Sequence, residues 1–179
     1  MEKYKLVLLS CCTPCSCGAI QQLSNYEIKE VSEFVVMFFN PNIFPKSEYI
    51  KRLEEQLKYC KKLGVKTVIF EYNHKDWLEY IKGFEKEPEK GKRCSRCFEY
   101  RFKFAEEWAI KNNYNAISSV FGVSFHKDQN QVNNSAIIIK KVKYLDIKWN
   151  SETRQSILKE SSFYRQNYCG CEFSIRKLS

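Results

Sequence analysis

The cysteines of this chain limit most strongly how it can fold. Eight of the nine lie in three tight groups, separated from one another by more than seventy residues: Cys11, Cys12, Cys15 and Cys17, then Cys94 and Cys97, then Cys169 and Cys171. The ninth, Cys60, shares an apolar helix face with Leu53 and Leu57, and we expect it to pack in the core. Thiols gathered from distant loops serve as disulfides, as ligands to zinc or an iron–sulfur cluster, or as a redox relay.

Structural disulfides fit this chain poorly. A chain of 179 residues can bury an ordinary core without covalent help, and an odd number of cysteines cannot pair completely. The first residues lead into only a short apolar run and do not resemble a signal peptide. No apolar stretch approaches the roughly 20 residues that cross a membrane. We therefore expect a cytoplasmic protein without membrane contact, whose thiols are kept reduced.

The chain is basic, with 30 Lys and Arg against 21 Asp and Glu and a formal net charge of +9. This charge fits either a lysine-rich proteome, in which surface lysines are simply solvated, or a polyanionic partner such as RNA. Charge alone does not separate the two explanations. Basic residues also gather beside the second and third cysteine groups: Lys90, Lys92, Arg93 and Arg96, then Arg165 and Arg176.

Strand-like and helix-like segments alternate along the chain. Short apolar or β-prone runs predict strands at 5–10, 34–39, 67–70, 116–120 and 143–147. Helical spacing predicts helices at 47–63, 76–81, 94–112, 130–141 and 153–160, and Pro14 can open another after the first strand. Because neither a linker nor a repeat divides the chain, we expect a single α/β domain over residues 1–179. Its sheet should be mostly parallel and flanked by helices.

The first cysteine group directly follows the first expected strand. In open α/β sheets, ligands gather at the carboxyl ends of the strands. We therefore expect a metal site at that edge of the sheet, which the other two groups can reach from their loops.

Each cysteine group favours a particular chemistry. Four thiols within residues 11–17 are too concentrated for packing alone, and thiolates near a helix N-terminus are stabilised by its unpaired N–H groups. The CxxC of Cys94 and Cys97 fits zinc, a cluster or a redox pair, and beside a second thiol group it becomes half of a four-cysteine metal centre. The CxC of Cys169 and Cys171 would form a strained, easily reduced disulfide, which suits a dithiol–disulfide cycle; further metal ligation is the alternative.

Four segments carry specific matches to a known family. In chain order they are Leu8-Leu-Ser-Cys-Cys-Thr-Pro-Cys-Ser, Phe39-Asn-Pro-Asn-Ile, Glu85-Lys-Glu-Pro-Glu-Lys-Gly-Lys-Arg-Cys-Ser-Arg-Cys-Phe and Tyr164-Arg-Gln-Asn-Tyr-Cys-Gly-Cys-Glu-Phe-Ser. Together they resemble the epoxyqueuosine reductase QueH family over about 4–174. The resemblance implies a cobalamin-independent enzyme that reduces the epoxide of epoxyqueuosine, at the wobble position of a tRNA anticodon, to complete queuosine.

The resemblance also implies roles for the cysteines. By matching motifs, a [4Fe-4S] cluster would be bound by Cys11, Cys12, Cys94 and Cys97, and a redox-active disulfide would be formed by Cys169 and Cys171. The family is further expected to hold an additional iron beside the cluster, for which Cys15 is the candidate ligand. Relatives often have His at position 9 and Ala at position 13, where this chain has Leu9 and Thr13. Cys17 is not part of the motif, so its role is open.

The substrate of such an enzyme is a tRNA anticodon stem-loop. We expect Arg93, Arg96 and Arg165 to contact RNA near the site, or one of them to brace the cluster or its thiolates. Tyr164 or Tyr168 can stack on a splayed base. The sequence does not identify the electron donor.

Two other functions are compatible with the cysteines alone. One is a non-enzymatic RNA-binding module with a structural four-cysteine zinc site, and the other is a thiol–disulfide oxidoreductase without metal. The CxC counts against the first, because a closed zinc site needs only four ligands. A brown colour of the anaerobically purified protein would distinguish a cluster from both.

Overall fold

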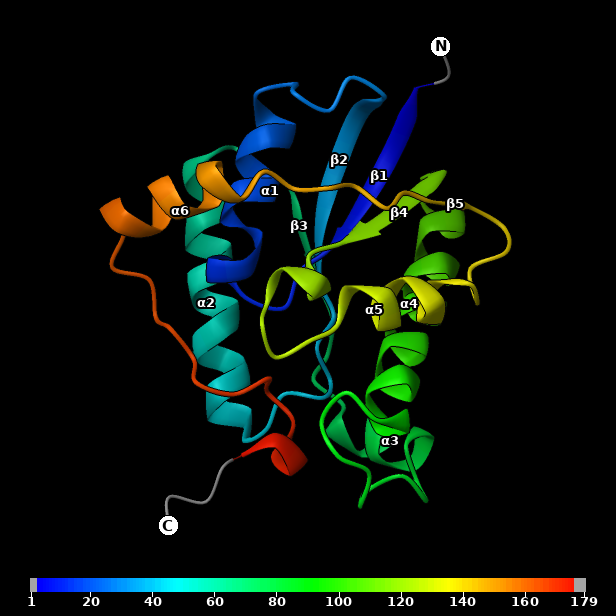
Figure 1. The fold of residues 1–179 in the computed structure, drawn as a ribbon. Coiled ribbons are helices and arrows are strands. Elements are labelled where there is room, and N and C mark those ends of the chain that lie inside the picture. Colours follow the sequence, from blue (N-terminus) through cyan, green and yellow to red (C-terminus); the bar gives the residue numbers. More distant parts are fainter. Residues whose placement is uncertain (1–2, 176–179) are drawn as a thin grey trace.

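A five-stranded parallel sheet forms the centre of the molecule (Figure 1). The computed structural model describes residues 3–175. The strands are β1 (Tyr4–Leu9), β2 (Val31–Phe38), β3 (Thr67–Ile69), β4 (Ala116–Ser119) and β5 (Lys143–Tyr144). They pair in the order β3-β2-β1-β4-β5, and every pair is parallel. The middle strands read as continuous apolar runs because both faces of the sheet are covered.

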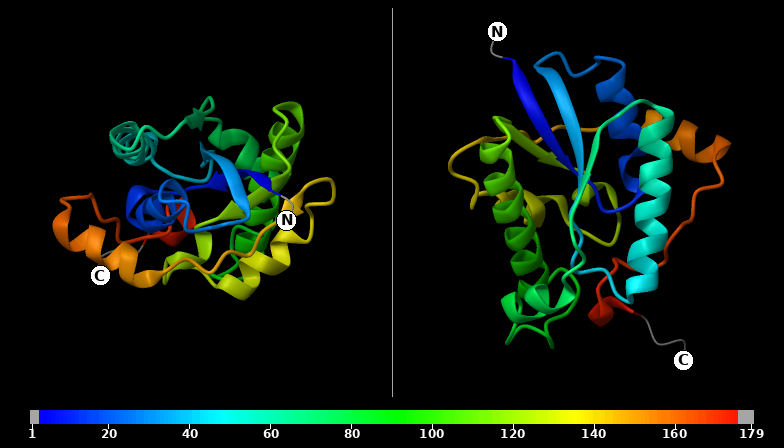
Figure 2. Two further views of the ribbon diagram at one scale, coloured as in Figure 1. Left: turned by 90° about the horizontal axis from the view of Figure 1, so that it is seen from above. Right: turned by 180° about the vertical axis from the view of Figure 1, so that it is seen from behind.

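Helices cover the sheet on both sides (Figures 1 and 2). On one side lie α1 (Thr13–Ser24), α2 (Lys46–Lys62) and α6 (Ser151–Glu160), and on the other α3 (His74–Tyr80), α4 (Lys92–Lys111) and α5 (Gln129–Ala136). Two short 3-10 helices, η1 (Phe121–Val123) and η2 (Glu172–Ser174), complete the described elements. The predicted α/β architecture with a parallel sheet is confirmed. Within residues 3–175, no helix is long and apolar enough to cross a membrane.

The strand order creates a crevice at one edge of the sheet. The connection after β1 runs into α1 on one face, whereas the connection after β4 runs into η1 and α5 on the other. Because β1 and β4 are neighbours, their outgoing connections diverge at the carboxyl ends of the strands. Cys11 lies in the first of these connections, so the fold places the first cysteine group beside the crevice.

Two elements near the end of the chain are shorter than predicted. Helix α5 ends at Ala136 rather than near residue 141, and β5 has two residues rather than five. The Glu106 carboxylate of α4 accepts hydrogen bonds from the backbone N–H groups of Lys140 and Lys141. These N–H groups are therefore satisfied by a side chain on another helix, and the chain turns at this point instead of continuing α5.

Helix α2 buries a different face from the one its apolar residues predict. Leu53 and Leu57 are only half-buried, whereas Arg52 and Gln56 are almost completely buried. The Gln56 side-chain oxygen accepts hydrogen bonds from Ser10 Oγ at 2.6 Å and Ser16 Oγ at 2.9 Å. Buried polar groups of this kind are stable only when they are hydrogen-bonded. These two hydrogen bonds fix α2 against the segment that carries the first cysteines.

Replacing Ile117 by alanine should lower the free energy of unfolding by about 2–5 kcal/mol, because this side chain is fully buried in β4 and its loss leaves a cavity. Ile137 provides the matched control, since it is 65% exposed, and the same replacement there should cost no more than about 0.5 kcal/mol. Urea unfolding followed by circular dichroism measures both values. Equal losses in the two variants would contradict the burial of β4 inside the sheet.

Candidate metal centre

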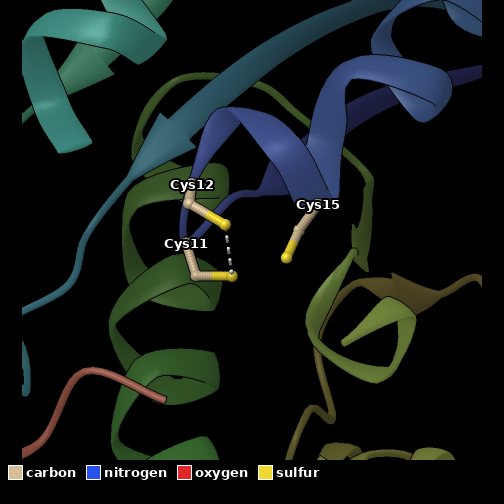
Figure 3. Close-up of side chains that lie close together, drawn as sticks. All are labelled: Cys11, Cys12 and Cys15. Carbon is tan, nitrogen blue, oxygen red and sulfur yellow. Dashed lines mark hydrogen bonds between the residues drawn. The ribbon is translucent and has the colours of Figure 1, made fainter. Parts of the chain in front are cut away.

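Three thiols meet where β1 passes into α1 (Figure 3). Cys11, Cys12 and Cys15 are buried, and their Sγ atoms all lie within 4.8 Å of one another. The Sγ atoms of Cys11 and Cys12 are 3.9 Å apart. Cys12 is the N-cap residue of α1, and Pro14, which the sequence predicts at the start of a helix, is its second residue. Within residues 3–175, no other group of three or more Cys, His, Asp or Glu ligand atoms comes this close together.

The second and third cysteine groups face a common cavity. Cys94 and Cys97 at the start of α4, together with Cys169 and Cys171 from the C-terminal segment, line a small cavity of about 20 Å³. Burial raises the pKa of Cys94 to about 11 and that of Cys97 to about 12. In the metal-free protein these two thiols are therefore neutral near pH 7, and a metal ion that binds them must displace their protons.

Buried cations connect this cavity to the first group. Lys127 lines the cavity, and its Nζ lies 3.8 Å from Cys11 Sγ. Although burial would lower the pKa of Lys127, the neighbouring thiolate groups, Cys11 above all, raise it overall. Arg101 also lines the cavity and is almost completely buried. Its guanidinium donates to the Phe39 carbonyl at 3.1 Å and lies over the Phe121 ring at 3.7 Å.

The three clustered thiols do not share negative charge equally. Hydrogen bonds from Cys12 and Cys15 lower the pKa of Cys11, and the positive charge of Lys127 adds to this effect. Hydrogen bonding to Cys11 and Cys12 raises the pKa of Cys15, whereas burial raises that of Cys12 to about 12. In the metal-free protein, Cys11 is therefore the thiol of this group that most readily carries charge.

The segment that carries Cys169 is attached to α2 through its backbone. Arg52 Nη1 donates to the Cys169 carbonyl at 3.1 Å, and Arg52 Nε is paired with Glu48 at 2.7 Å. Gly170 has a φ of +133°, and a β-carbon there would lie 3.1 Å from Ile43 and 3.2 Å from the Arg52 guanidinium. This backbone conformation is one that glycine adopts readily and other residues rarely do.

Two further contacts fix the C-terminal segment across the site. Gln166 Nε2 lies 2.7 Å from Cys12 Sγ, so this segment also reaches the first cysteine group. The His74 ring joins the Pro41 carbonyl at 2.7 Å to the Glu172 carboxylate at 2.8 Å. The sequence gives His74 no ligand-like spacing to a cysteine group, and in the structure it contacts the residue after Cys171 rather than a thiol.

Arg93 makes contacts that brace a loop. Its side chain is buried, and Nη1 donates to the carbonyl of Glu85 at 2.9 Å and to that of Glu87. The guanidinium lies over the Phe173 ring at 5.1 Å. These contacts connect the loop before α4 to the C-terminal segment. Bracing of the cluster by one of the arginines stays a prediction. An RNA contact by Arg93 stays a prediction.

The other residues expected to contact RNA differ in their surroundings. Arg165 is exposed and donates to the Leu158 carbonyl at 2.8 Å. Arg96 is half-buried, and its guanidinium pairs with Glu99 at 3.2 Å. The Tyr164 hydroxyl donates to Glu48 at 3.0 Å. Their RNA contacts also stay predictions, and Arg176 lies outside the described residues.

Two cysteines stand apart from these groups. Cys60 is buried in the core and accepts a hydrogen bond from Gln56 Nε2 at 3.3 Å, in agreement with a packing role. Cys17 is fully buried on α1, and its Sγ lies 3.9 Å from the Pro14 carbonyl. It is not among the three thiols that cluster at the start of this helix.

Comparison with known proteins identifies the family. A family model described as Epoxyqueuosine reductase QueH matches residues 6–177. The chain belongs to this family. A QueH of Haemophilus influenzae is 39% identical over 180 residues, which cover 96% of this chain and 72% of the relative. A QueH of Acinetobacter baylyi is 37% identical over 180 residues, with 96% and 81% covered. The resemblance found in the sequence motifs is thus confirmed.

The fold also has a solved counterpart outside the QueH family. It is similar to the U34-tRNA thiolase NcsA from Methanococcus maripaludis, whose structure was solved with its [4Fe-4S] cluster. The TM-score is 0.55 at 12% sequence identity, and the match covers 98% of this chain and 63% of the NcsA chain. At this identity, the likeness supports the fold.

Replacing Arg52 by methionine should lower the free energy of unfolding by about 3–5 kcal/mol, because it leaves the mostly buried Glu48 carboxylate without a positive charge beside it. Lys58 lies on the same helix but is exposed, so Lys58→Met should change stability by less than about 0.5 kcal/mol. Urea unfolding measures both. If Arg52→Met loses no more stability than Lys58→Met, the contacts of Arg52 with Glu48 and with the Cys169 carbonyl do not stabilise the packing of the C-terminal segment on α2.

Proposed function

We propose that this chain reduces the epoxide of epoxyqueuosine in tRNA to complete queuosine. Membership of the QueH family supports the reaction. The observation that carries the proposal is that Cys169 and Cys171 face the same cavity as Cys94 and Cys97, next to the Lys127 that contacts Cys11. A dithiol beside a group of metal-binding thiols is what an electron-transferring site requires, whereas a closed structural zinc site needs only four ligands.

The donor set fits an iron–sulfur cluster, because such clusters are held by cysteine thiolates. As ligands of a [4Fe-4S] cluster we propose Cys11, Cys12, Cys94 and Cys97, with Cys15 as a ligand of an additional iron. Lys127 and Arg101 would offset the negative charge that several thiolates bring into the interior. When bound, the cluster would supply single electrons, and an iron with an open position would act as a Lewis acid.

The cysteine pair matches the stoichiometry of the reaction. Removing an epoxide oxygen as water requires two electrons and two protons. Oxidation of the Cys169–Cys171 dithiol supplies both: the two C–O bonds break, an alkene and an S–S bond form, and the two thiol protons leave with the oxygen as water. A separate reductant must then return two electrons and two protons to the disulfide, so we propose an electron-donor protein or small-molecule reductant as a further partner.

The substrate we propose is the anticodon stem-loop of a tRNA that carries epoxyqueuosine. The formal net charge of +9 favours association with phosphates. The name of the fold neighbour, a U34-tRNA thiolase, adds an analogy with another enzyme that acts at position 34 of tRNA. We propose the cytoplasm as the compartment, since free thiols and tRNA meet there.

The direct test uses the full chain, purified and kept without oxygen, with dithionite as the electron source. Incubation with tRNA that carries epoxyqueuosine should yield queuosine, detected by mass spectrometry of the digested nucleosides as the loss of one oxygen. A tRNA that already carries queuosine is the control and should not change. No conversion by an iron-loaded preparation would contradict the proposed reaction.

Cys97→Ser should remove most of the bound iron and acid-labile sulfide, because a cluster that loses one of four thiolate ligands is poorly held. Cys60→Ser provides the control, since Cys60 is buried away from the cavity and should leave both contents unchanged. Iron, sulfide and zinc are measured on anaerobically purified protein. Full iron and sulfide in Cys97→Ser would remove this cysteine from the ligand set, and zinc in place of iron would favour the structural site.

Cys169→Ser should keep the iron and sulfide of the wild type but fail to reduce epoxyqueuosine in tRNA over repeated cycles. The reason is that its single remaining thiol cannot form the disulfide that stores two electrons. Metal analysis and multiple-turnover conversion are measured on the same preparation. If this variant loses its iron, the third group acts as metal ligands, and if it turns over normally, the dithiol has no part in the reaction.

A further inference from the structure

A second cleft lies beside the three clustered thiols and has no role in the function proposed above. It measures about 430 Å³ and has Cys15 and Ala19 of α1 in its wall. A second wall is formed by η1 and α5, and a third wall by the segment that joins β5 to α6. In Figure 1 this segment crosses from the helices on one side of the sheet to those on the other. The cleft thus occupies the crevice where the connections of β1 and β4 diverge.

The size and location of this cleft suit a small organic group. Ligand pockets commonly measure about 300–1,000 Å³, and in α/β sheets they lie where neighbouring connections diverge at the carboxyl ends of the strands. Because Cys15 lines the cleft, a molecule bound there has one end next to the clustered thiols. The cleft therefore provides access from solvent to the centre at which the epoxide must react.

One wall of the cleft holds an oriented carboxylate. Asp146 Oδ2 accepts a hydrogen bond from Asn133 Nδ2 at 2.8 Å, and Oδ1 accepts one from Gln129 Nε2 at 3.4 Å. Gln129 Nε2 also donates to Asn133 Oδ1 at 2.8 Å, so the three side chains fix one another. A β-carbon at Gly122 would collide with the Gln129 amide, so the glycine leaves room for this arrangement. Since each carboxylate oxygen has two lone pairs, Asp146 can accept further hydrogen bonds from a ligand.

The carboxylate distinguishes one kind of nucleobase. Among the standard bases, only guanine presents two adjacent donors on its Watson–Crick edge, N1–H and the 2-amino group, and these match the two oxygens of a carboxylate. The base of epoxyqueuosine is a 7-deazaguanine that keeps this edge, while its epoxide-bearing substituent leaves from the other ring. The cleft has Asp146 in one wall and Cys15, one of the clustered thiols, in another.

We propose that the cleft binds the wobble base itself, turned out of the anticodon loop, and that Asp146 accepts hydrogen bonds from its N1–H and 2-amino groups. This inference rests on the tRNA substrate proposed above. Trp149 offers a stacking surface in the same cleft, and its indole N–H is held by the Ser119 carbonyl at 3.1 Å. Lys148 and Arg154 add positive charge to the lining, which suits the adjoining sugar–phosphate chain. Asp146 is thus a specificity-determining residue for the reaction.

The test measures binding, so it does not depend on turnover. Two anticodon stem-loops are used, one with guanosine at the wobble position and one with inosine, which lacks only the 2-amino group. The wild type should bind the inosine loop about tenfold more weakly, as expected for the loss of one arm of a bidentate contact. Asp146→Asn should bind both loops alike, because one acceptor oxygen has become a donor. Asp146 and Asp76 are both exposed, but Asp76 lies on α3 outside the cleft lining, so Asp76→Asn removes the same charge and should keep the tenfold difference.

A second pair of variants tests the cleft without changing Asp146. Asn130 is exposed on α5 and lines the cleft, so Asn130→Trp should fill it and weaken binding of the guanosine loop about tenfold or more. Asn134 is exposed on the same helix but outside the cleft lining, and Asn134→Trp should bind as the wild type does. Fluorescence anisotropy at one fixed salt concentration gives all the affinities.

The possible outcomes separate this inference from the proposed reaction. Equal binding of the two loops by the wild type, or a tenfold difference that persists in Asp146→Asn, would overturn base recognition by Asp146. If epoxide reduction is nevertheless observed, the proposed function stands without it. If the wild type binds neither loop, recognition of the guanine edge in the cleft fails, and the proposed reaction is decided by the conversion of tRNA that carries epoxyqueuosine. Normal binding of the guanosine loop by Asn130→Trp would overturn the cleft as the base site.

Discussion

Negative charge on buried sulfur is the constraint on which the rest of this structure depends. A low-dielectric interior disfavours thiolates, and burial accordingly raises the pKa of Cys12 and Cys97. Two buried cations, Lys127 and Arg101, oppose this effect from positions between the cysteine groups. Arg101 is itself buried at a cost, which its hydrogen bond to the Phe39 carbonyl at the end of β2 partly offsets. The electrostatics of the site therefore links α4, the loop after β4 and the sheet.

The topology of the sheet places the clustered thiols and the larger cleft at the same edge. The connections after β1 and β4 leave in opposite directions, and the first thiols and the larger cleft both lie where they part. The second and third cysteine groups reach this edge from α4 and from the C-terminal segment. Lys127 and the cavity lined by the other thiols lie on one side of the clustered thiols, while Cys15 lines the larger cleft, which opens to solvent. Such a division suits a reaction in which electrons and substrate arrive from different directions.

The elements that the sequence predicts well are those that depend on local pattern. Continuous apolar runs predict the central strands, and the spacing of Cys94 and Cys97 predicts a pair of thiols at the start of a helix, which α4 confirms. Before the structure is known, the alternation of strands and helices predicts only that the three cysteine groups can reach one edge of the sheet, and the family motifs alone assign a role to each group. The length of α5 could not be predicted, because it depends on Glu106 of another helix.

The charged residues of the site were the hardest to predict. Arg52 falls outside the apolar face of its helix, and Lys127 lies in a loop, so in a sequence both resemble solvated surface residues. Their burial depends on partners distant in the chain, namely the Cys169 carbonyl and Cys11 Sγ. Arg93 is a third example, because its side chain is buried against carbonyl groups of its own loop, while an RNA contact by this residue stays a prediction. A buried cation is recognised by the acceptors around it, and these are known only from the fold.

Gly170, between Cys169 and Cys171, is a position at which substitution is strongly disfavoured. Its positive φ and the close approach of Ile43 and Arg52 each disfavour a side chain, and they do so independently. Every single-nucleotide missense change in a glycine codon introduces a β-carbon, so no one-step mutation at this position escapes either penalty. Relieving the contact with Arg52 would break the hydrogen bond to the Cys169 carbonyl and still leave the backbone strained. Both the positive φ and the close contacts therefore favour glycine between the two thiols, and no single compensating change relieves both.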